Sequence, residues 1–377
     1  MADAHRLVTR DGRVSVTVLR YGLTIHAIHV KVDDRVYDVL AGPEDPKGHR
    51  AHRQFFGPVI GRYANRLPAG RSESHGVTVD LEAWGGTHVH HHGGPPARGP
   101  ASEGLEQRGP WDTVVWTQVH APHLFSASDL SAWDDVGVWA IESPDGDQGY
   151  PGRLRVEACV GVRAVPAHVG DVHVEYRARI LDTCKATPLN MTQHWGFRLP
   201  SPTELDENQG VLGHTLQLGV PDAPLERLAL DAQGVPTGDL IPCTDAAHDW
   251  RSGKQIGTAM PQGGYDHFYV WGPSTARVAR LQSAGLCLDV TTNQTGVQLY
   301  TANEERPLGE APKCAHNAGA AYGPHCAAFL EFSAPHATFL RAPLARRVGS
   351  DTLLRQGETY RHVVDVAVCL GSMGGEA

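Results

Sequence analysis

Hydrophobic and polar residues alternate one by one along much of the chain, the pattern of strands that bury one face. Residues 154–162 place Leu, Val, Ala, Val and Val on one face, and residues 172–180 repeat the pattern with Val, Val, Tyr, Ala and Ile. The link between them contains Pro166 and Gly170. These segments are therefore predicted to form an antiparallel hairpin with a long connection.

Similar alternation predicts further strands, separated by clusters of Gly, Pro, Asp and Asn. These strands are expected around 14–18, 28–32, 268–271, 277–281, 287–292, 297–301, 327–332 and 360–368. A short helix is expected only near 57–65. With no repeat and no linker, the chain is predicted to be all-β, one large antiparallel β-sandwich in a single domain over residues 1–377, with a core of about 6–368.

Composition excludes several classes of partner. The chain has 41% hydrophobic residues, 20% charged residues and a formal net charge of -9, without a basic stripe, so a nucleic-acid partner is not expected. The sequence has no apolar run of membrane-spanning length and no secretory leader, so no membrane partner is expected either. The seven scattered cysteines, without a C-x-x-C motif, indicate reduced thiols and a cytoplasmic location, although Cys314 and Cys326 could pair across one loop.

Three polar residues stand in settings that suggest chemistry. His194 lies beside Trp195 in TPLNMTQHWGF, Glu331 is surrounded by Phe329, Leu330 and Phe332, and Asp266 follows a Gly-Gly pair. From the local sequence alone each retains a structural explanation: a packed histidine, an edge-strand glutamate and a turn aspartate. Anomerisation of a sugar hemiacetal would use such a carboxylate and histidine as base and acid, expected a ring-width apart.

The stretch from Gly85 to Pro96 contains His88, His90, His91 and His92. His90 and His92 would share one face of a strand, as paired metal ligands do. However, no Asp, Glu or Cys follows at ligand spacing, and Gly93 and Gly94 indicate a backbone that another group approaches closely. A metal site is therefore not expected. The role of this stretch, like that of the Ala/Gly-rich segment 303–324, stays open.

Taken together, several segments resemble the aldose 1-epimerase (galactose mutarotase) family. They occur in the family's order and cover nearly the whole chain: Gly61–Leu67 (GRYANRL), His92–Gly94, Ser143–Gly152, Thr187–His194, Tyr265–His267, Gly296–Thr301, Leu330–Glu331 and Gly357–Tyr360. The resemblance implies the galactose mutarotase-like supersandwich. It also implies an isomerase that interconverts the anomers of free aldohexoses, such as galactose or glucose, without a cofactor.

The resemblance implies a role for each matching residue. His194 would be the general acid at the ring oxygen, Glu331 the general base at the C1 hydroxyl, and His92 a hydrogen-bonding partner near the ring oxygen. Sugar hydroxyls would be bound by Asn65, Arg66, Asp266 and Gln298. Trp195, which departs from the family pattern, would add a stacking surface. The expected partner is a monosaccharide, bound by a monomer or a homodimer.

Other functions remain open. A hexose-6-phosphate 1-epimerase of the same fold would need a cationic phosphate clamp, for which Arg66 and Arg198 are available. A non-catalytic sugar-binding protein would keep the groove but would not need both an acid and a base. A glycosidase would use two carboxyl groups, such as Asp266 and Glu331, and would leave His194 and His92 without a role.

Overall fold

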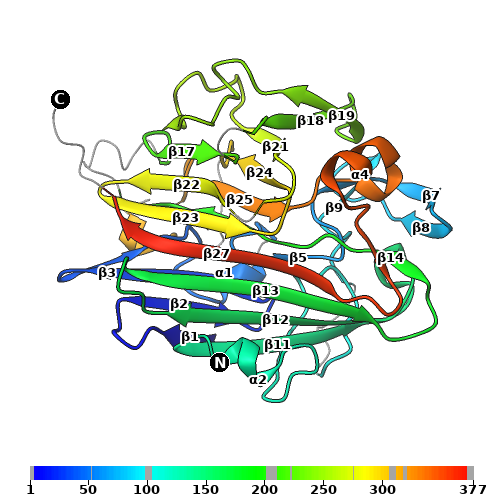
Figure 1. The fold of residues 1–377 in the computed structure, drawn as a ribbon, viewed down its shortest axis with the longest axis horizontal. Coiled ribbons are helices and arrows are strands. Elements are labelled where there is room, and N and C mark those ends of the chain that lie inside the picture. Colours follow the sequence, from blue (N-terminus) through cyan, green and yellow to red (C-terminus); the bar gives the residue numbers. More distant parts are fainter. Residues whose placement is uncertain are drawn as a thin grey trace.

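The computed structural model describes residues 4–51, 53–97, 104–200, 210–220, 223–274, 276–304, 311–316 and 321–371. Its largest sheet has nine strands and crosses the molecule in Figure 1. The strand order is β10 (Thr117–Gln118), β11 (Asp135–Ser143), β12 (Leu154–Arg163), β13 (Gly170–Ile180), β27 (Tyr360–Leu370), β23 (Leu286–Thr292), β22 (Arg277–Ser283), β17 (Thr215–Leu218) and β20 (Lys254–Gln255). All neighbouring strands in this sheet are antiparallel.

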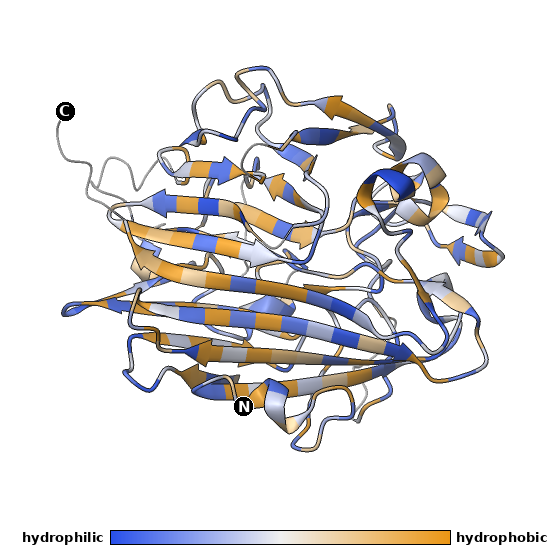
Figure 2. Ribbon diagram, viewed as in Figure 1, coloured by the Kyte–Doolittle hydropathy of each residue, from blue (hydrophilic) through white to orange (hydrophobic). Residues whose placement is uncertain are grey.

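The predicted hairpin is confirmed by β12 and β13, which pair from Leu154 opposite Ile180 to Arg163 opposite Asp171. Alternating hydrophobic and hydrophilic bands run along these strands in Figure 2. The apolar side chains of both strands enter the main core, where Val156 and Val174 are fully buried. Alternation therefore identified the inward face of the large sheet correctly.

Two further sheets complete the architecture. One has four strands, β1 (Ala4–Val8), β2 (Val14–Leu19), β3 (Thr24–Val32) and β4 (Arg35–Asp38). The other has six, in the order β16 (Trp195–Phe197), β25 (Ala328–Ser333), β24 (Gly296–Tyr300), β21 (Asp266–Val270), β18 (Glu226–Leu230) and β19 (Pro236–Pro242). One continuous core contains Val16, Val174 and Leu330, one from each sheet. The predicted all-β class and sheet-on-sheet packing are confirmed.

Short strand pairs join segments that are distant in the sequence. They are β14 (Ala186–Pro188) with β26 (Leu353–Arg355), β15 (Thr192–Gln193) with β5 (Val59–Ile60), β6 (Arg66–Pro68) with β9 (Val89–His91), and β7 (Gly70–Ser74) with β8 (Val77–Leu81). The helices are short: α1 (Gly48–Ala51), α2 (Ala127–Leu130), α4 (Ala342–Val348), and the 3-10 turns η1 (Asp147–Gly149), η2 (Cys314–His316) and η3 (Thr338–Leu340).

The helix expected near 57–65 is wrong. This segment is extended around β5, which pairs with β15, and Ala64 donates its backbone N–H to the Asn190 carbonyl. Its backbone groups are thus satisfied by a distant segment instead of by a local helix. The contact holds residues 57–66 beside His194, which lies between β15 and β16.

The seven cysteines all carry free thiols, and Cys314 is exposed whereas Cys326 is buried. Within the described residues, no helix has both the length and the apolar character needed to cross a membrane. Of the Ala/Gly-rich segment 303–324, residues 305–310 and 317–320 lie outside the described part of the chain.

Candidate active site

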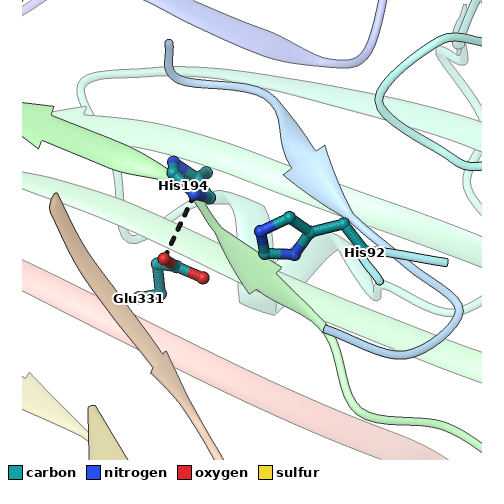
Figure 3. A group of neighbouring side chains, drawn as sticks. All are labelled: His92, His194 and Glu331. Carbon is teal, nitrogen blue, oxygen red and sulfur yellow. Dashed lines mark ion pairs between the residues drawn. The ribbon is translucent and has the colours of Figure 1, made fainter. Parts of the chain in front are cut away.

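His194 and Glu331 meet because of the pairing between β16 and β25. Trp195 lies opposite Leu330 in that pair, so the preceding histidine is brought next to the following glutamate, on the other face of the strands. His194 Nε2 lies 3.1 Å from Glu331 Oε1, and each side chain is only 4% exposed. Figure 3 shows this ion pair with His92 beside it. Two segments separated by more than a hundred residues thus form one ionisable pair.

His92 reaches the pair from the end of β9. Its backbone adopts a left-handed φ of 48°, and the following Gly93 passes so close to Gly61 that a Cβ on Gly93 would lie 2.1 Å from the Gly61 carbonyl oxygen. Only glycine fits this position. The turn directs the imidazole of His92 toward His194, with ring centroids 5.2 Å apart. Left-handed backbone at a non-glycine residue costs free energy and is often found at functional sites.

The protonation of His92 follows from its neighbours. The Asn65 backbone N–H donates to His92 Nδ1 at 3.1 Å, so Nδ1 must be the unprotonated nitrogen. Burial lowers the pKa of His92 well below its usual value, and the nearby histidines and arginines lower it further. His92 is therefore a neutral imidazole whose Nε2–H is a hydrogen-bond donor.

The three side chains open onto a cavity of about 620 Å³. Its lining also includes Asn65, Arg66 and Asp266, which the sequence assigned to substrate. Two buried polar atoms of the ion pair, His194 Nδ1 and Glu331 Oε2, have no hydrogen-bond partner among the described residues. Unpaired buried polar atoms cost free energy, and a bound polar ligand would relieve that cost.

Asp266 is the centre of a second polar group in the cavity wall. Arg66 Nη2 lies 2.7 Å from Asp266 Oδ2, and the amide nitrogen of Gln298 donates to Asp266 Oδ1 at 2.5 Å. Arg66 Nη1 also donates to Asn65 Oδ1 at 3.3 Å. Gln298 does not itself line the large cavity; it holds Asp266 from behind. The residues that the resemblance assigns to the sugar hydroxyls therefore lie close together. Gln298 is the exception, because it contacts Asp266 and does not reach the large cavity.

The structure corrects the role expected for Trp195. Its ring is 1% exposed and stacks on Phe197 within the main core, with ring centroids 5.5 Å apart. Successive residues of a strand point to opposite faces, so a neighbour of the cavity-facing His194 must face inward. The aromatic surface of the cavity comes instead from Phe55 and Tyr300. Strand alternation therefore separates the two neighbours: His194 faces the cavity and Trp195 faces the core.

Sequence reasoning missed Arg53 and Phe55. Arg53 forms a bidentate ion pair with Asp112, with nitrogen–oxygen distances of 2.6 and 2.7 Å, and donates to the His92 carbonyl at 3.2 Å. Phe55 packs beside His92, with ring centroids 4.8 Å apart. Both residues precede the GRYANRL motif. No periodic signal marks them, because Phe55 has a left-handed φ of 57°.

The expectation that His90 and His92 share a face is also wrong, because the strand ends at His91 and the backbone turns. His90 is buried on the other side, where its Nδ1 lies 2.8 Å from the Glu82 carbonyl oxygen. Instead, ligand-type atoms of His92, His194 and Glu331 lie within 4.8 Å of one another. Two histidines and a carboxylate are a ligand set that Zn²⁺ accepts, so these residues fit a zinc ion.

The spacing of acid and base also differs from the expectation. A gap of one pyranose was expected, yet His194 and Glu331 are in direct contact. The chemistry explains the smaller distance. The C1 hydroxyl oxygen and the ring oxygen are bonded to the same carbon, so groups that act on both must converge on one point instead of flanking the ring.

Comparisons with known proteins show the family to which the chain belongs. The family model "Aldose 1-epimerase" matches residues 5–367. Galactose mutarotase of Rattus norvegicus is 32% identical over 303 residues, which is 78% of this chain and 76% of the rat protein. Aldose 1-epimerase of Haemophilus influenzae is 27% identical over 312 residues, 79% of either chain.

A solved structure, the GalM/aldose epimerase homologue from C. elegans, aligns over 99% of this chain and 100% of its own with a TM-score of 0.78 at 20% identity, a likeness of fold. The protein described here is thus a galactose mutarotase-like β-sandwich. The chain belongs to the aldose 1-epimerase family, and the activity that this membership supports is that of a mutarotase, an isomerase.

Proposed function

We propose that the protein interconverts the α and β anomers of free aldohexoses, such as galactose or glucose, by acid–base catalysis without a cofactor. The observation that carries the proposal is the 3.1 Å contact between His194 Nε2 and Glu331 Oε1 at the wall of a large polar cavity. A base and an acid are the only groups that the reaction needs.

In the proposed reaction Glu331 accepts the proton of the C1 hydroxyl while His194 donates a proton to the ring oxygen. The bond between C1 and the ring oxygen breaks, and the open-chain aldehyde forms. C1 then rotates about its bond to C2, and the transfers run in reverse when the ring closes on the other face of the carbonyl. Neither group is consumed, because each proton returns to its starting site by the end of the cycle.

His92 has a distinct part in this scheme. Because its Nδ1 accepts from the Asn65 N–H, it presents Nε2–H to the cavity. A fixed neutral donor beside the ring oxygen would stabilise the negative charge that develops there during opening. Asp266, Arg66 and Asn65 would bind the hydroxyls at the other end of the sugar, where a carboxylate, a guanidinium and an amide match groups that both donate and accept.

The hexose-6-phosphate alternative has little support. Both arginines of the cavity already pair with carboxylates: Arg66 with Asp266 and Arg53 with Asp112. The exposed Glu304 adds a further carboxylate to the cavity lining. Arg198, the other cation available for a clamp, is buried and donates to the Cys326 carbonyl. A phosphate dianion would have to displace one of these ion pairs.

The approach to anomeric equilibrium of fresh α-galactose, α-glucose and glucose 6-phosphate, followed by polarimetry with and without protein, tests the proposal. Accelerated equilibration of the free sugars supports it, and a faster rate with the phosphate would favour the alternative. Galactose binding without acceleration would indicate a sugar-binding protein.

The cellular location is a separate proposal. The free thiols favour a reducing compartment, so we propose that the protein acts in the cytoplasm.

A further inference from the structure

The backbone that carries His92 makes an unusual turn. His92, Gly93 and Gly94 all have positive φ, of 48°, 77° and 106°. Left-handed backbone is costly at a non-glycine residue such as His92, and it persists only where the surrounding structure holds it in place. The groups that restrain this turn therefore decide where the imidazole of His92 points.

One guanidinium group holds both ends of the turn. Arg53 Nη2 donates to the His92 carbonyl at 3.2 Å, and Arg53 Nη1 donates to the Gly94 carbonyl at 2.8 Å. The first and last residues of the turn are thus hydrogen-bonded to the same side chain. Because the donor is charged, these bonds are stronger than those between neutral groups.

Arg53 is itself fixed by Asp112. Its Nε and Nη2 lie 2.6 and 2.7 Å from the two carboxylate oxygens, a bidentate geometry that sets the plane of the guanidinium. The Asp112 side chain is only 2% exposed, and the residue follows Trp111, which belongs to the main core. A continuous chain of contacts therefore runs from the core through Asp112 and Arg53 to the turn at His92.

Arg53 acts on His92 in two further ways. Its guanidinium carbon lies 4.9 Å from the centroid of the Phe55 ring, and that ring packs beside His92 with centroids 4.8 Å apart. Burial is the main cause of the low pKa of His92, and the positive charge of Arg53 is among those that lower it further. Arg53 thus favours the neutral imidazole as well as its position.

A purely structural role explains this ion pair less well. Arg53 lines the large cavity, and the Asp112 carboxylate is buried beside it. Burying an ion pair adds little stability, because the cost of desolvation offsets most of the attraction. The placement of a reacting group has a larger effect, since a displacement of about 1 Å can lower a rate by about 10²-fold.

We propose that Arg53 and Asp112 are positioning residues, which hold the turn at His92 so that its Nε2–H points at the ring oxygen of the sugar. Neither side chain has to touch the reacting atoms, because both act through His92. This inference rests on the proposed function, since it takes His92 to be the donor at the ring oxygen.

The test is a double-mutant cycle on kcat for galactose mutarotation, followed by polarimetry. Arg53→Lys keeps the positive charge but cannot donate in a planar fork. It should lower kcat about tenfold and change KM less than about twofold, because the side chains that bind the sugar hydroxyls are unaltered. In a His92→Ala background the same substitution should lower kcat less than about twofold further, because its effect passes through the missing imidazole.

Asp112→Asn keeps the shape of the side chain and removes its charge, so it repeats the cycle without altering Arg53. Arg71→Lys, at an exposed position of β7, is the matched control and should keep the wild-type kcat. Thermal unfolding of every variant shows whether the compared proteins are folded.

A loss of kcat that appears only when His92 is present supports the proposal. An equal loss with and without His92 overturns it, as does wild-type kcat in folded Arg53→Lys protein. Wild-type kcat in His92→Ala also overturns it, although the proposed function then stands. Wild-type protein that accelerates no sugar overturns the proposed function and this inference together.

Discussion

Glu331 Oε1 and His194 Nε2 lie 3.1 Å apart, on β25 and immediately before β16, and both side chains are buried. Each has its other polar atom buried without a described partner. A purely structural ion pair is normally satisfied at every atom, since half-satisfied buried charges are costly. We interpret the relationship as a pair that is completed by substrate.

His92 is predicted to act as a neutral donor. His92→Ala should lower kcat for galactose mutarotation by about 10²-fold or more, as loss of one positioned donor does in other enzymes. His92→Gln, whose amide N–H can reach a similar position, should recover part of the loss. Because burial lowers the pKa of His92 well below its usual value of 6.5, its ionisation should not appear near pH 6.5 in the wild-type pH–rate profile. Equal kcat in the Ala and Gln variants would contradict the donor role.

Substitutions of Phe55, which lines the cavity, and of Trp195, which lies in the core, should change different properties of the protein. Phe55→Ala removes a ring that lines the cavity and should raise KM for galactose severalfold while the protein stays folded. Trp195→Phe changes a fully packed core position and should lower the free energy of unfolding by about 1–3 kcal/mol, with KM nearly unchanged. Steady-state kinetics and urea unfolding test both variants. If KM rose in Trp195→Phe but not in Phe55→Ala, then Trp195, and not Phe55, would be the residue that stacks on the sugar.

The stability of the protein should depend on pH through its buried histidines. Burial lowers the pKa of His90 and His316 to about 4 and of His214 to about 3, from 6.5. Below pH 6.5 the unfolded chain binds protons that the folded protein does not, so the free energy of unfolding should fall between about pH 6.5 and 4. Each such histidine contributes about 1.4 kcal/mol per pH unit at most.

Urea unfolding at pH 7.5, 6.0 and 5.0 measures this slope. His90→Asn, which keeps a donor for the Glu82 carbonyl, should flatten it, and the exposed control His88→Gln should not. A free energy of unfolding that is the same at pH 7.5 and 5.0 would show that the buried histidines are not held neutral by the fold.

Removal of metal ions should leave the activity intact. Ligand-type atoms of His92, His194 and Glu331 are close enough to hold Zn²⁺, but the proposed reaction uses the same atoms for proton transfer. Dialysis against a strong chelator should therefore change kcat less than twofold, and added Zn²⁺ should inhibit by occupying the acid–base pair. Loss of activity after dialysis that Zn²⁺ restores would replace the acid–base account with a metal-dependent one.

The sequence predicted the sheets well because strand alternation is a local property. Both β12 and β13, and the strand that carries Glu331, were expected within a few residues of their observed bounds. It failed at 57–65, where pairing with β15 overrides local preference. Motif matches located His194, Glu331, His92, Asn65, Arg66 and Asp266, all of which line one cavity.

The remaining features depend on tertiary contacts that local sequence does not encode. The displacement of Gln298 behind Asp266, and the replacement of Trp195 by Phe55 as the aromatic surface, follow from which face of each segment meets the cavity. Left-handed backbone at Phe55, Asn65 and His92 interrupts the alternation at the residues that matter most. The roles of these residues in catalysis stay predictions until they are tested.

The central claim is tested most directly by polarimetry of fresh α-galactose with Glu331→Gln. This change keeps the shape of the side chain and removes its basicity, so the catalysed rate should fall by about 10²–10⁴-fold, toward the spontaneous rate. The exposed control Glu73→Gln should equilibrate the sugar as fast as wild type, and both variants should unfold near the wild-type temperature. A folded Glu331→Gln protein that anomerises galactose at the wild-type rate would contradict the account.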